Sequence, residues 1–530
     1  MLRWQRPIAF DRHLGQSDGL LFSAVFGVEK RGQKIALDAP FVLGRVDTAL
    51  VGILAVTAIY FLIYPVWRTQ FFIEIWFTEG WNAYFQDAAA MGGRLYPEPG
   101  ALTVNNYPPL SFYAIGLFGK IFGDNLFVGR AISLIAVIVV SCEIFCCVRT
   151  LVGGIAGPAI GSLWYLAIMC HSFTTYVGAN DPQLAGQAIM CGGLALFLAR
   201  ERAGGSVLVP LLIMVVGGFW KHNMIAIPFT AIIWLFMRRG HAAWRPVLLS
   251  GFATASGLVV CAAIFGADFF SNILHPRHYS IDHVIGNIGH LQWSALAMVI
   301  WLGWALPTRS TERFPAKWMP VRVKKTRQKK EPEPRSDSIG TERALAAKFT
   351  LVHVPIALAA CILQWFGDKV FGNAEFDLMI ALGIAVGASF ETIRTFRYLG
   401  ATAAKIAMVS LLTLRLLATD RHEPLLVMFD PSFRAQFEAN ERTTYKEVKQ
   451  VAAIEGLVFC SNKIVCRAAG KPFAVDDFKV EEMVATAALS AQDLAQLLLT
   501  QQITTFKNDP ATWGTVDNSL SRAIARRAVR

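Results

Sequence analysis

Two carboxylates in this sequence lie where they can act on a substrate at a membrane surface. Glu79 is part of segment 76–84 (WFTEGWNAY), which follows the first strongly apolar stretch, and Asp181 is part of segment 178–182 (GANDP). A carboxylate at such a surface can serve as a general base toward a hydroxyl group or as a metal ligand. For Asp181, capping of the next helix, with Pro182 in its first turn, is an equally good interpretation.

Three cations are candidates for binding an anion at the same surface. Lys221 and His222 form a tight turn between two apolar segments, where a cation without a partner is costly. A lipid phosphate at membrane depth suits Lys221, and extension of its side chain to the interface is the alternative. Arg94 and Arg277, in other polar segments, are candidates for the same role.

A metal site is a weaker interpretation of the segment that holds Arg277. Three histidines and one aspartate lie there, but their spacing matches no tight set of metal ligands. Interfacial polar residues explain the pattern better, so no cofactor is assigned and a divalent metal is left open. The side chains concerned are His275, His278, Asp282 and His283.

The sequence lacks the motifs of nucleotide-driven chemistry. It has no phosphate-binding loop, no dinucleotide fingerprint, no Gly-x-Ser-x-Gly and no Cys-x-x-Cys. The energy for a transfer reaction must therefore come from an activated substrate.

Composition indicates a polytopic membrane protein. Hydrophobic residues make up 54% of the 530 residues and charged residues only 17%, against roughly 25% in soluble domains. The net charge of +12 comes from Lys and Arg in alternate polar segments, which is the positive-inside pattern. Nucleic acid is therefore not a predicted partner.

Eleven apolar segments predict eleven membrane spans. Residues 1–47 form a cytoplasmic tail in this topology, and the basic segment 307–347 is a cytoplasmic linker. All the candidate residues then fall in outward-facing segments, which are 67–125, 171–181, 221–222, 267–288 and 367–374. The expected spans are residues 48–66, 126–148, 152–170, 182–200, 206–220, 223–237, 247–266, 289–306, 348–366, 375–392 and 402–419.

The first outer segment, 67–125, is too long for a simple connection between two spans. Its aromatic content argues against disorder. We interpret it as the lid or floor of an active site on the membrane surface.

Composition changes after residue 420, and residues 420–530 predict a small α/β domain outside the membrane. Cys460 and Cys466 lie in it on the oxidising side, where a disulfide is permitted but its geometry is open. The other seven of the nine cysteines fall in apolar segments, where they pack. The expected strands are 425–430, 457–460 and 473–478, and the expected helices are 447–454 and 491–501.

Four short motifs resemble the first outer loop of GT-C membrane glycosyltransferases. They are 78–84 (TEGWNAY), 92–97 (GGRLYP), 107–110 (YPPL) and the Gly-Arg pair at 129–130. Segment 178–182 is similar to the second acidic loop of that superfamily, and Lys221 to one of its basic positions. The resemblance covers residues 48–400, and its nearest members are bacterial lipid A aminoarabinose and galacturonic acid transferases and protein O-mannosyltransferases.

The resemblance implies a mainly α fold, a polytopic transmembrane helical bundle of about eleven spans with the small C-terminal α/β extracytoplasmic domain. It implies transfer of a sugar from a polyprenyl-phosphate donor, with inversion, to a lipid, glycan or protein acceptor outside a bacterial inner membrane. Glu79 would be the general base, supported by Asp181. Lys221, Arg94 and Arg277 would neutralise the leaving phosphate. The residues expected to contact substrate are Trp81, Asn82, Tyr84, Tyr107 and His222.

Two departures from the superfamily pattern affect these assignments. Many relatives have two adjacent acids at the start of the loop, where this chain has Thr78 before Glu79. Several relatives have lysine directly before the Pro-Pro pair, where this chain has Tyr107. The phosphate must therefore be held differently, or the assigned cations are not the ones that bind it.

Two other functions are compatible with the sequence. One is a transporter or flippase of lipid-linked sugars, and the other is a non-catalytic subunit of a cell-envelope assembly that uses residues 420–530 as a contact module. A transporter predicts charged residues paired within spans and internal repeats. Neither feature is visible in the sequence.

Overall fold

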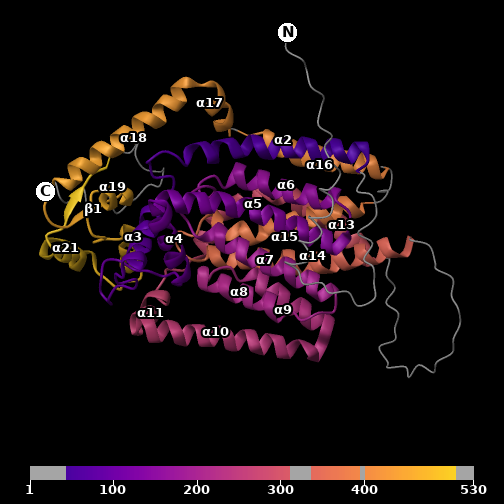
Figure 1. Cartoon of the computed structure of the whole chain (residues 1–530), viewed down its shortest axis with the longest axis horizontal. Coiled ribbons are helices and arrows are strands. Elements are labelled where there is room, and N and C mark those ends of the chain that lie inside the picture. Colours follow the sequence, from indigo (N-terminus) through magenta and orange to yellow (C-terminus); the bar gives the residue numbers. More distant parts are fainter. Residues whose placement is uncertain (1–42, 311–335, 394–399, 420, 509–530) are drawn as a thin grey trace, which may run out of the picture. The chain divides into compact units, whose positions relative to one another are not determined.

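The computed structural model describes residues 43–310, 336–393, 400–419 and 421–508 (Figure 1). Most of the expected tail 1–47 and much of the expected linker 307–347 lie outside these ranges. Every segment expected to span the membrane is a helix. These helices are α2 (Arg45–Arg68), α5 (Asn125–Val152), α6 (Ala156–Ser172), α7 (Gln183–Arg202), α8 (Leu208–Trp220), α9 (Ala226–Arg239), α10 (Trp244–Phe265), α13 (Ala295–Ser310), α14 (Ser336–Trp365), α15 (Phe376–Thr392) and α16 (Ala401–Leu417).

Five helical stretches in the described part of the chain are long and apolar enough to cross a membrane. In the stretch that contains α15, 94% of the 18 most apolar consecutive residues are buried inside the protein. In the stretch formed by α9 and α10, the corresponding share is 11%. Helix α15 is therefore the centre of the bundle, whereas α9 and α10 present apolar side chains outward, as lipid-facing helices do. The stretches are Arg45–Arg68, Asn125–Val152, Ala226–Phe265, Glu342–Trp365 and Gly372–Thr392.

The central helix α15 packs against α6 through glycines on both helices. A Cβ atom added to Gly161 of α6 would lie 2.3 Å from the carbonyl oxygen of Gly383 in α15. One at Gly157 would lie 2.4 Å from the carbonyl oxygen of Gly387. Each helix thus carries a Gly-x-x-x-Gly pattern, and the small residues let the two backbones approach closely.

The first outer segment contains two helices, α3 (Thr78–Met91) and α4 (Leu110–Phe122), joined by an irregular stretch over residues 92–109. They pack on each other so closely that a Cβ at Gly116 would lie 2.5 Å from the carbonyl oxygen of Gln86. Aromatic side chains of the two helices, among them Trp81 and Phe112, belong to one buried apolar cluster. The remaining short elements are η1 (Gly240–Ala243), α11 (Ala267–Ile273), α12 (Ile281–Asn287), η2 (Ile288–Trp293) and η3 (Gly372–Glu375).

The C-terminal region is more helical than the sequence predicted. The expected strand 425–430 is wrong, because Pro424 at the start of α17 favours a helix and a short apolar run does not distinguish the two. The expected strand 473–478 is also wrong, because a helix begins at Asp477. The elements are α17 (Glu423–Phe429), α18 (Pro431–Ala452), β1 (Val458–Cys460), α19 (Lys463–Ala468), α20 (Asp477–Ala485), α21 (Ala491–Thr500) and β2 (Thr504–Phe506), and β1 pairs with β2 in parallel.

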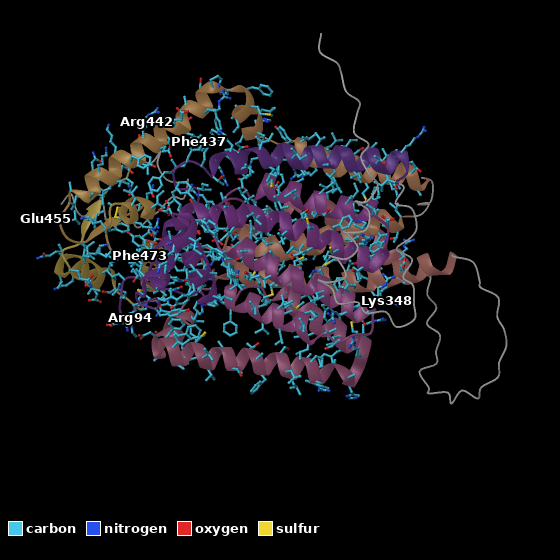
Figure 2. All side chains as sticks on the ribbon, in the orientation of Figure 1. Arg94, Lys348, Phe437, Arg442, Glu455 and Phe473 are labelled. Atoms are coloured by element: carbon cyan, nitrogen blue, oxygen red, sulfur yellow. A yellow bond between two sulfur atoms is a disulfide. The ribbon has the colours of Figure 1, made fainter. Side chains whose placement is uncertain are left out.

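The C-terminal region is docked on the first outer segment. Arg467 of α19 forms ion pairs with Asp87 at 2.6 Å and with Asp124 at 2.9 Å. Phe473, labelled in Figure 2, stacks on Tyr84 with 4.8 Å between ring centroids. Helices α3 and α19 are so close that a Cβ at Gly80 would lie 2.5 Å from the Cβ of Lys463. The region therefore forms one structure with the outer segment.

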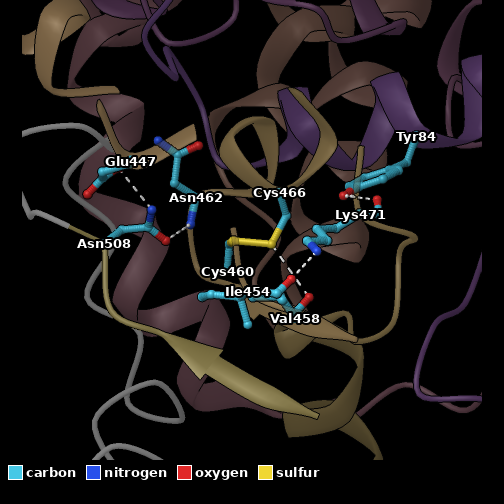
Figure 3. Close-up of a disulfide and its surroundings, with 9 residues drawn as sticks. All are labelled: Tyr84, Glu447, Ile454, Val458, Cys460, Asn462, Cys466, Lys471 and Asn508. Atoms are coloured by element: carbon cyan, nitrogen blue, oxygen red, sulfur yellow. Dashed lines mark hydrogen bonds between the residues drawn. A yellow bond between two sulfur atoms is a disulfide. The ribbon is translucent and has the colours of Figure 1, made fainter. Parts of the chain in front are cut away.

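Cys460 and Cys466 form a disulfide that links β1 to α19, with 5.8 Å between their Cα atoms (Figure 3). Lys471, in the same close-up, accepts a hydrogen bond at its carbonyl oxygen from the Tyr84 hydroxyl at 3.0 Å. The disulfide thus closes a short loop beside the docking contact with α3.

We expect Gly161→Ala to lower the free energy of unfolding by about 1–3 kcal/mol, because its methyl group must push α6 and α15 apart. Gly251→Ala in α10 is the matched control, since a Cβ there meets no atom within 4 Å. The measurement is the midpoint of thermal unfolding of the purified proteins in detergent. An unchanged midpoint for Gly161→Ala would contradict the close packing.

We expect peptide mapping of the non-reduced protein to find Cys460 joined to Cys466 and the other cysteines as thiols. Cys460→Ser together with Cys466→Ser should lower stability by about 2 kcal/mol, because the closed loop is short. Free, alkylatable Cys460 in protein isolated without reductant would show that the pairing is wrong.

Candidate active site

One cavity of about 330 Å³ collects side chains from every segment expected to face outward and from the C-terminal region. Asp181 and Lys221 line it from the second and third outer segments. Ile225 and Leu363, at the start of α9 and in α14, also line it and are exposed on the bundle. The cavity is therefore polar at its centre and continues onto an apolar surface of the helices.

Asp181 and Lys221 form a buried ion pair at this cavity. The Lys221 ammonium group lies 3.0 Å from Asp181 Oδ1, which also accepts a hydrogen bond of 2.8 Å from the backbone N–H of Gln183. Asp181 is thus both the cap of α7 and a cavity residue, so the two interpretations of this carboxylate are compatible. Its Oδ2 accepts a longer bond of 3.3 Å from the Thr78 hydroxyl, and no other bond among the described residues.

An aromatic ring lies over the ammonium group of Lys221. The Tyr107 ring centroid lies 4.5 Å from its nitrogen, a distance typical of a cation–π contact. Burial alone would lower the pKa of Lys221, but the neighbouring Asp181 outweighs it and raises the pKa above its usual value. His222 also lines the cavity, where loss of hydration and the nearby Lys221 and Arg277 lower its pKa to about 4. At neutral pH the site thus holds a charged lysine beside a neutral histidine.

Glu79 is fully buried and lies outside the cavity, which is lined by its neighbour Thr78. The Glu79 carboxylate accepts two bonds from Arg130 of α5, at 2.8 and 2.7 Å. It also accepts bonds from the backbone N–H groups of Ile75, at 2.7 Å, and Asn180, at 2.8 Å. Every strong acceptor position of Glu79 is therefore occupied within the protein, which does not favour a role as general base.

The geometry of α3 separates Thr78 from Glu79. Consecutive residues of an α-helix point about 100° apart, so the two side chains have different neighbours. Thr78 faces Asp181, and Glu79 faces Arg130. The bond from Asn180 to Glu79 fixes the residue directly before Asp181. The geometry thus makes Glu79 a positioning residue for Asp181.

The structure brings some of the other predicted residues to the cavity and leaves others away from it. Trp81 and Arg277 line it. Asn82 is buried, and its amide donates to the carbonyl oxygens of Thr78 and Asn180. Tyr84 contacts the C-terminal region instead.

Arg94, labelled in Figure 2, is exposed and is not among the residues that line the cavity. Its guanidinium group is paired with Glu98 and, at 2.6 Å, with Asp268. The structure therefore separates Arg94 from the other candidate phosphate-binding cations.

The C-terminal region supplies cavity residues that the sequence did not reveal. Lys463 lines the cavity from α19, and Asp476 and Lys479 line it from the start of α20. Lys369, from the loop after α14, lies with its ammonium nitrogen 4.9 Å from the Phe478 ring centroid. The only available sequence signal was the polar segment that contains Asp476, which we interpreted as a strand.

For the histidines and aspartate of the fourth outer segment, metal binding was the weaker interpretation, and in the described ranges no three His, Cys, Asp or Glu side chains are close enough to hold a metal ion. His278 and His283 come together with 5.4 Å between ring centroids, and His283 lies 3.7 Å from Asp368. These contacts tie the fourth outer segment to the loop after α14.

Glu79→Gln should lower the free energy of unfolding by about 3–5 kcal/mol, because it leaves the buried charge of Arg130 without its partner. Glu98→Gln, at an exposed pair in the same outer segment, is the control and should change stability by less than about 1 kcal/mol. Unfolding midpoints in detergent provide the measurement. If Glu79→Gln loses activity while its stability is unchanged, Glu79 instead acts directly in the reaction.

Comparisons with known proteins agree with this architecture. A model of the dolichyl-phosphate-mannose-protein mannosyltransferase family matches residues 106–266, which is under a third of the chain. This stretch holds Tyr107, Asp181 and Lys221. A comparison with curated proteins finds no match.

Among solved structures, the chain is similar to ArnT from Cupriavidus metallidurans bound to undecaprenyl phosphate. The TM-score is 0.50 at 12% sequence identity, over 86% of this chain and 89% of that one. ArnT from the same organism in the apo state gives 0.45 at 13% identity, over 80% and 84% of the two chains, and no argument rests on it. The chain therefore shares the fold of ArnT, and the stretch that carries the Asp181–Lys221 pair is similar to the mannosyltransferase family.

Proposed function

We propose that this protein transfers a sugar from a polyprenyl-phosphate donor to an acceptor hydroxyl group at the extracytoplasmic face of a bacterial inner membrane. The observation that carries the proposal is the Asp181–Lys221 pair, which faces a cavity built from all the segments expected outside. The exposed Leu363 and Ile225 at its wall give the polyprenyl chain an apolar path from the membrane. The Cys460–Cys466 disulfide supports an oxidising, outer compartment for this end of the protein.

Lys221 is the group that binds the donor phosphate. It is buried and charged, and its ammonium group has the Tyr107 ring on one side and Asp181 on another. When the bond between the anomeric carbon and the phosphate oxygen breaks, the electron pair leaves with the phosphate. A fixed positive charge stabilises that developing negative charge without reorganisation. Arg277, which lines the same cavity, adds a second cation to its wall.

Asp181 accepts the proton of the acceptor hydroxyl in this proposal. Its Oδ1 is held by Lys221 and the Gln183 N–H, whereas its Oδ2 has only the Thr78 hydroxyl at 3.3 Å. The acceptor oxygen attacks the anomeric carbon from the side opposite the phosphate, its proton passes to Oδ2, and the configuration inverts. Glu79 and Asn180 hold the loop from which Asp181 projects.

Tyr107, Trp81 and His222 form the part of the wall next to Lys221 and bind the sugar end of the donor. Trp81 packs edge-on against Tyr107, with 5.1 Å between ring centroids. His222 remains neutral above about pH 5, so it donates or accepts hydrogen bonds without adding charge. The acceptor is a lipid, a cell-envelope glycan or a protein, which this wall does not distinguish.

The test uses a deletion strain that is complemented with the wild-type gene, with Asp181→Asn or with Lys221→Gln. Mass spectrometry measures the rate at which each strain incorporates sugar into its envelope glycans. Asp181→Asn should lower this rate at least 100-fold, the usual size of a lost general base, while the purified protein still binds undecaprenyl phosphate. Lys221→Gln should lower both the rate and this binding.

The exposed Asp493→Asn is the control, matched to Asp181→Asn in chemistry and remote from the cavity. Rates are normalised to the amount of protein in the membrane. Full activity of Asp181→Asn would show that Asp181 is not the base. Identical glycans in the deletion and wild-type strains would contradict a transferase.

A further inference from the structure

A carboxylate residue of the C-terminal region lines the cavity and has one buried oxygen without a partner. Asp476 is 2% exposed and is one of the cavity-lining residues. Its Oδ1 has no hydrogen-bond partner among the described residues. Asp476 is the residue before α20, and the backbone of Lys479 in that helix is among the groups that favour its ionised form.

The backbone of Asp476 is held in place by the first outer segment. Its N–H donates a 2.8 Å hydrogen bond to the carbonyl oxygen of Leu102. Leu102 and Val475 belong to one buried apolar cluster. The position of the carboxylate in the cavity is therefore fixed by contacts that leave its Oδ1 free.

The lysines near Asp476 already have other acidic partners. Lys463 is paired with Asp477 at 2.6 Å, and Lys479 with Glu482 at 2.6 Å. Burial raises the pKa of Asp476 to about 6, against the opposing effect of Lys463. The group is therefore mostly ionised at pH 7, beside cations whose charge is largely balanced by others.

Leaving such a carboxylate oxygen buried without a donor costs free energy in the empty protein. A folded chain keeps a group of this kind where a ligand supplies the missing donor. A phosphate cannot do so, because it carries the same charge as Asp476. Hydroxyl groups can, and they are the hydrogen-bond donors that a sugar offers in number.

We propose that Asp476 binds a hydroxyl group of the reacting ligands, so that the C-terminal region is part of the substrate site. The inference rests on the proposed transferase function and goes beyond it by assigning a substrate contact outside the helical bundle. The hydroxyl group comes from the transferred sugar or from the acceptor, which the test distinguishes. Asp181 belongs to the loop before α7 and Asp476 to the segment before α20, so two separate elements bring carboxylates to the ligand.

The test compares the full-length wild type with Asp476→Asn and with the exposed control Asp493→Asn. One measurement is the rate of sugar incorporation into envelope glycans per molecule of protein in the membrane. The other is binding to the purified protein of undecaprenyl phosphate, which has the chain and the phosphate but no sugar. Asp476→Ser repeats the test if the asparagine variant does not accumulate.

We expect Asp476→Asn to lower the incorporation rate at least tenfold and to leave the affinity for undecaprenyl phosphate within twofold of the wild type. Asp493→Asn should change neither. Binding of undecaprenyl phosphate that carries mannose separates the two sources of the hydroxyl. Weaker binding of this lipid by Asp476→Asn assigns the contact to the donor sugar, and unchanged binding with a lower rate assigns it to the acceptor.

Two results would overturn the inference. One is an incorporation rate within twofold of the wild type for Asp476→Asn, when Asp181→Asn has lost activity; the proposed function then stands without this contact. The other is an equal loss of rate and of undecaprenyl phosphate binding, which would mean that Asp476 maintains the shape of the cavity. Failure of the proposed function looks different, because the wild-type gene itself then adds no sugar.

Discussion

The arrangement of the outer segments depends on the buried ion pair between Glu79 and Arg130. Arg130 belongs to α5 and is fully buried, so its charge needs a partner inside the protein. Glu79 supplies that partner from α3. The remaining guanidinium N–H groups donate to the carbonyl oxygens of Phe71 and Ile73, both at 2.6 Å, and thereby define the path of the chain between α2 and α3. One arginine thus connects a membrane helix to the start of the first outer segment.

Hydrogen bonds connect the same ion pair to the part of the cavity that holds Asp181. Glu79 accepts the N–H of Asn180, and the side-chain amide of Asn180 forms a reciprocal pair of 2.9 Å bonds with Gln86 of α3. Asp181 follows directly and meets Lys221 and Thr78 at the cavity wall. A carboxylate whose oxygens are all engaged is suited to holding a loop, and one with a weakly engaged oxygen is suited to taking a proton. In the proposed reaction the two acids divide these roles.

The cavity is completed by a region that follows the last membrane helix. Residues of α19 and α20 reach the wall because Arg467 pairs with the outer segment and because α19 lies almost in backbone contact with α3 at Gly80. The disulfide between Cys460 and Cys466 restrains the segment just before and within α19. Docking contacts thereby fix the charges of Lys463 and Asp476 at the wall of the cavity.

The sequence alone determined the helical bundle and the positions of its apolar helices, because long apolar runs are properties of neighbouring residues. It also predicted Asp181, Lys221, Tyr107 and His222, which do come together. The sequence could not show which of Thr78 and Glu79 lines the cavity, because that depends on how α3 is rotated against α5. It also could not show that Arg94 lies outside the cavity. Only the tertiary structure decided that the C-terminal region reaches the cavity, because Asp476 meets the other site residues through contacts between segments hundreds of residues apart.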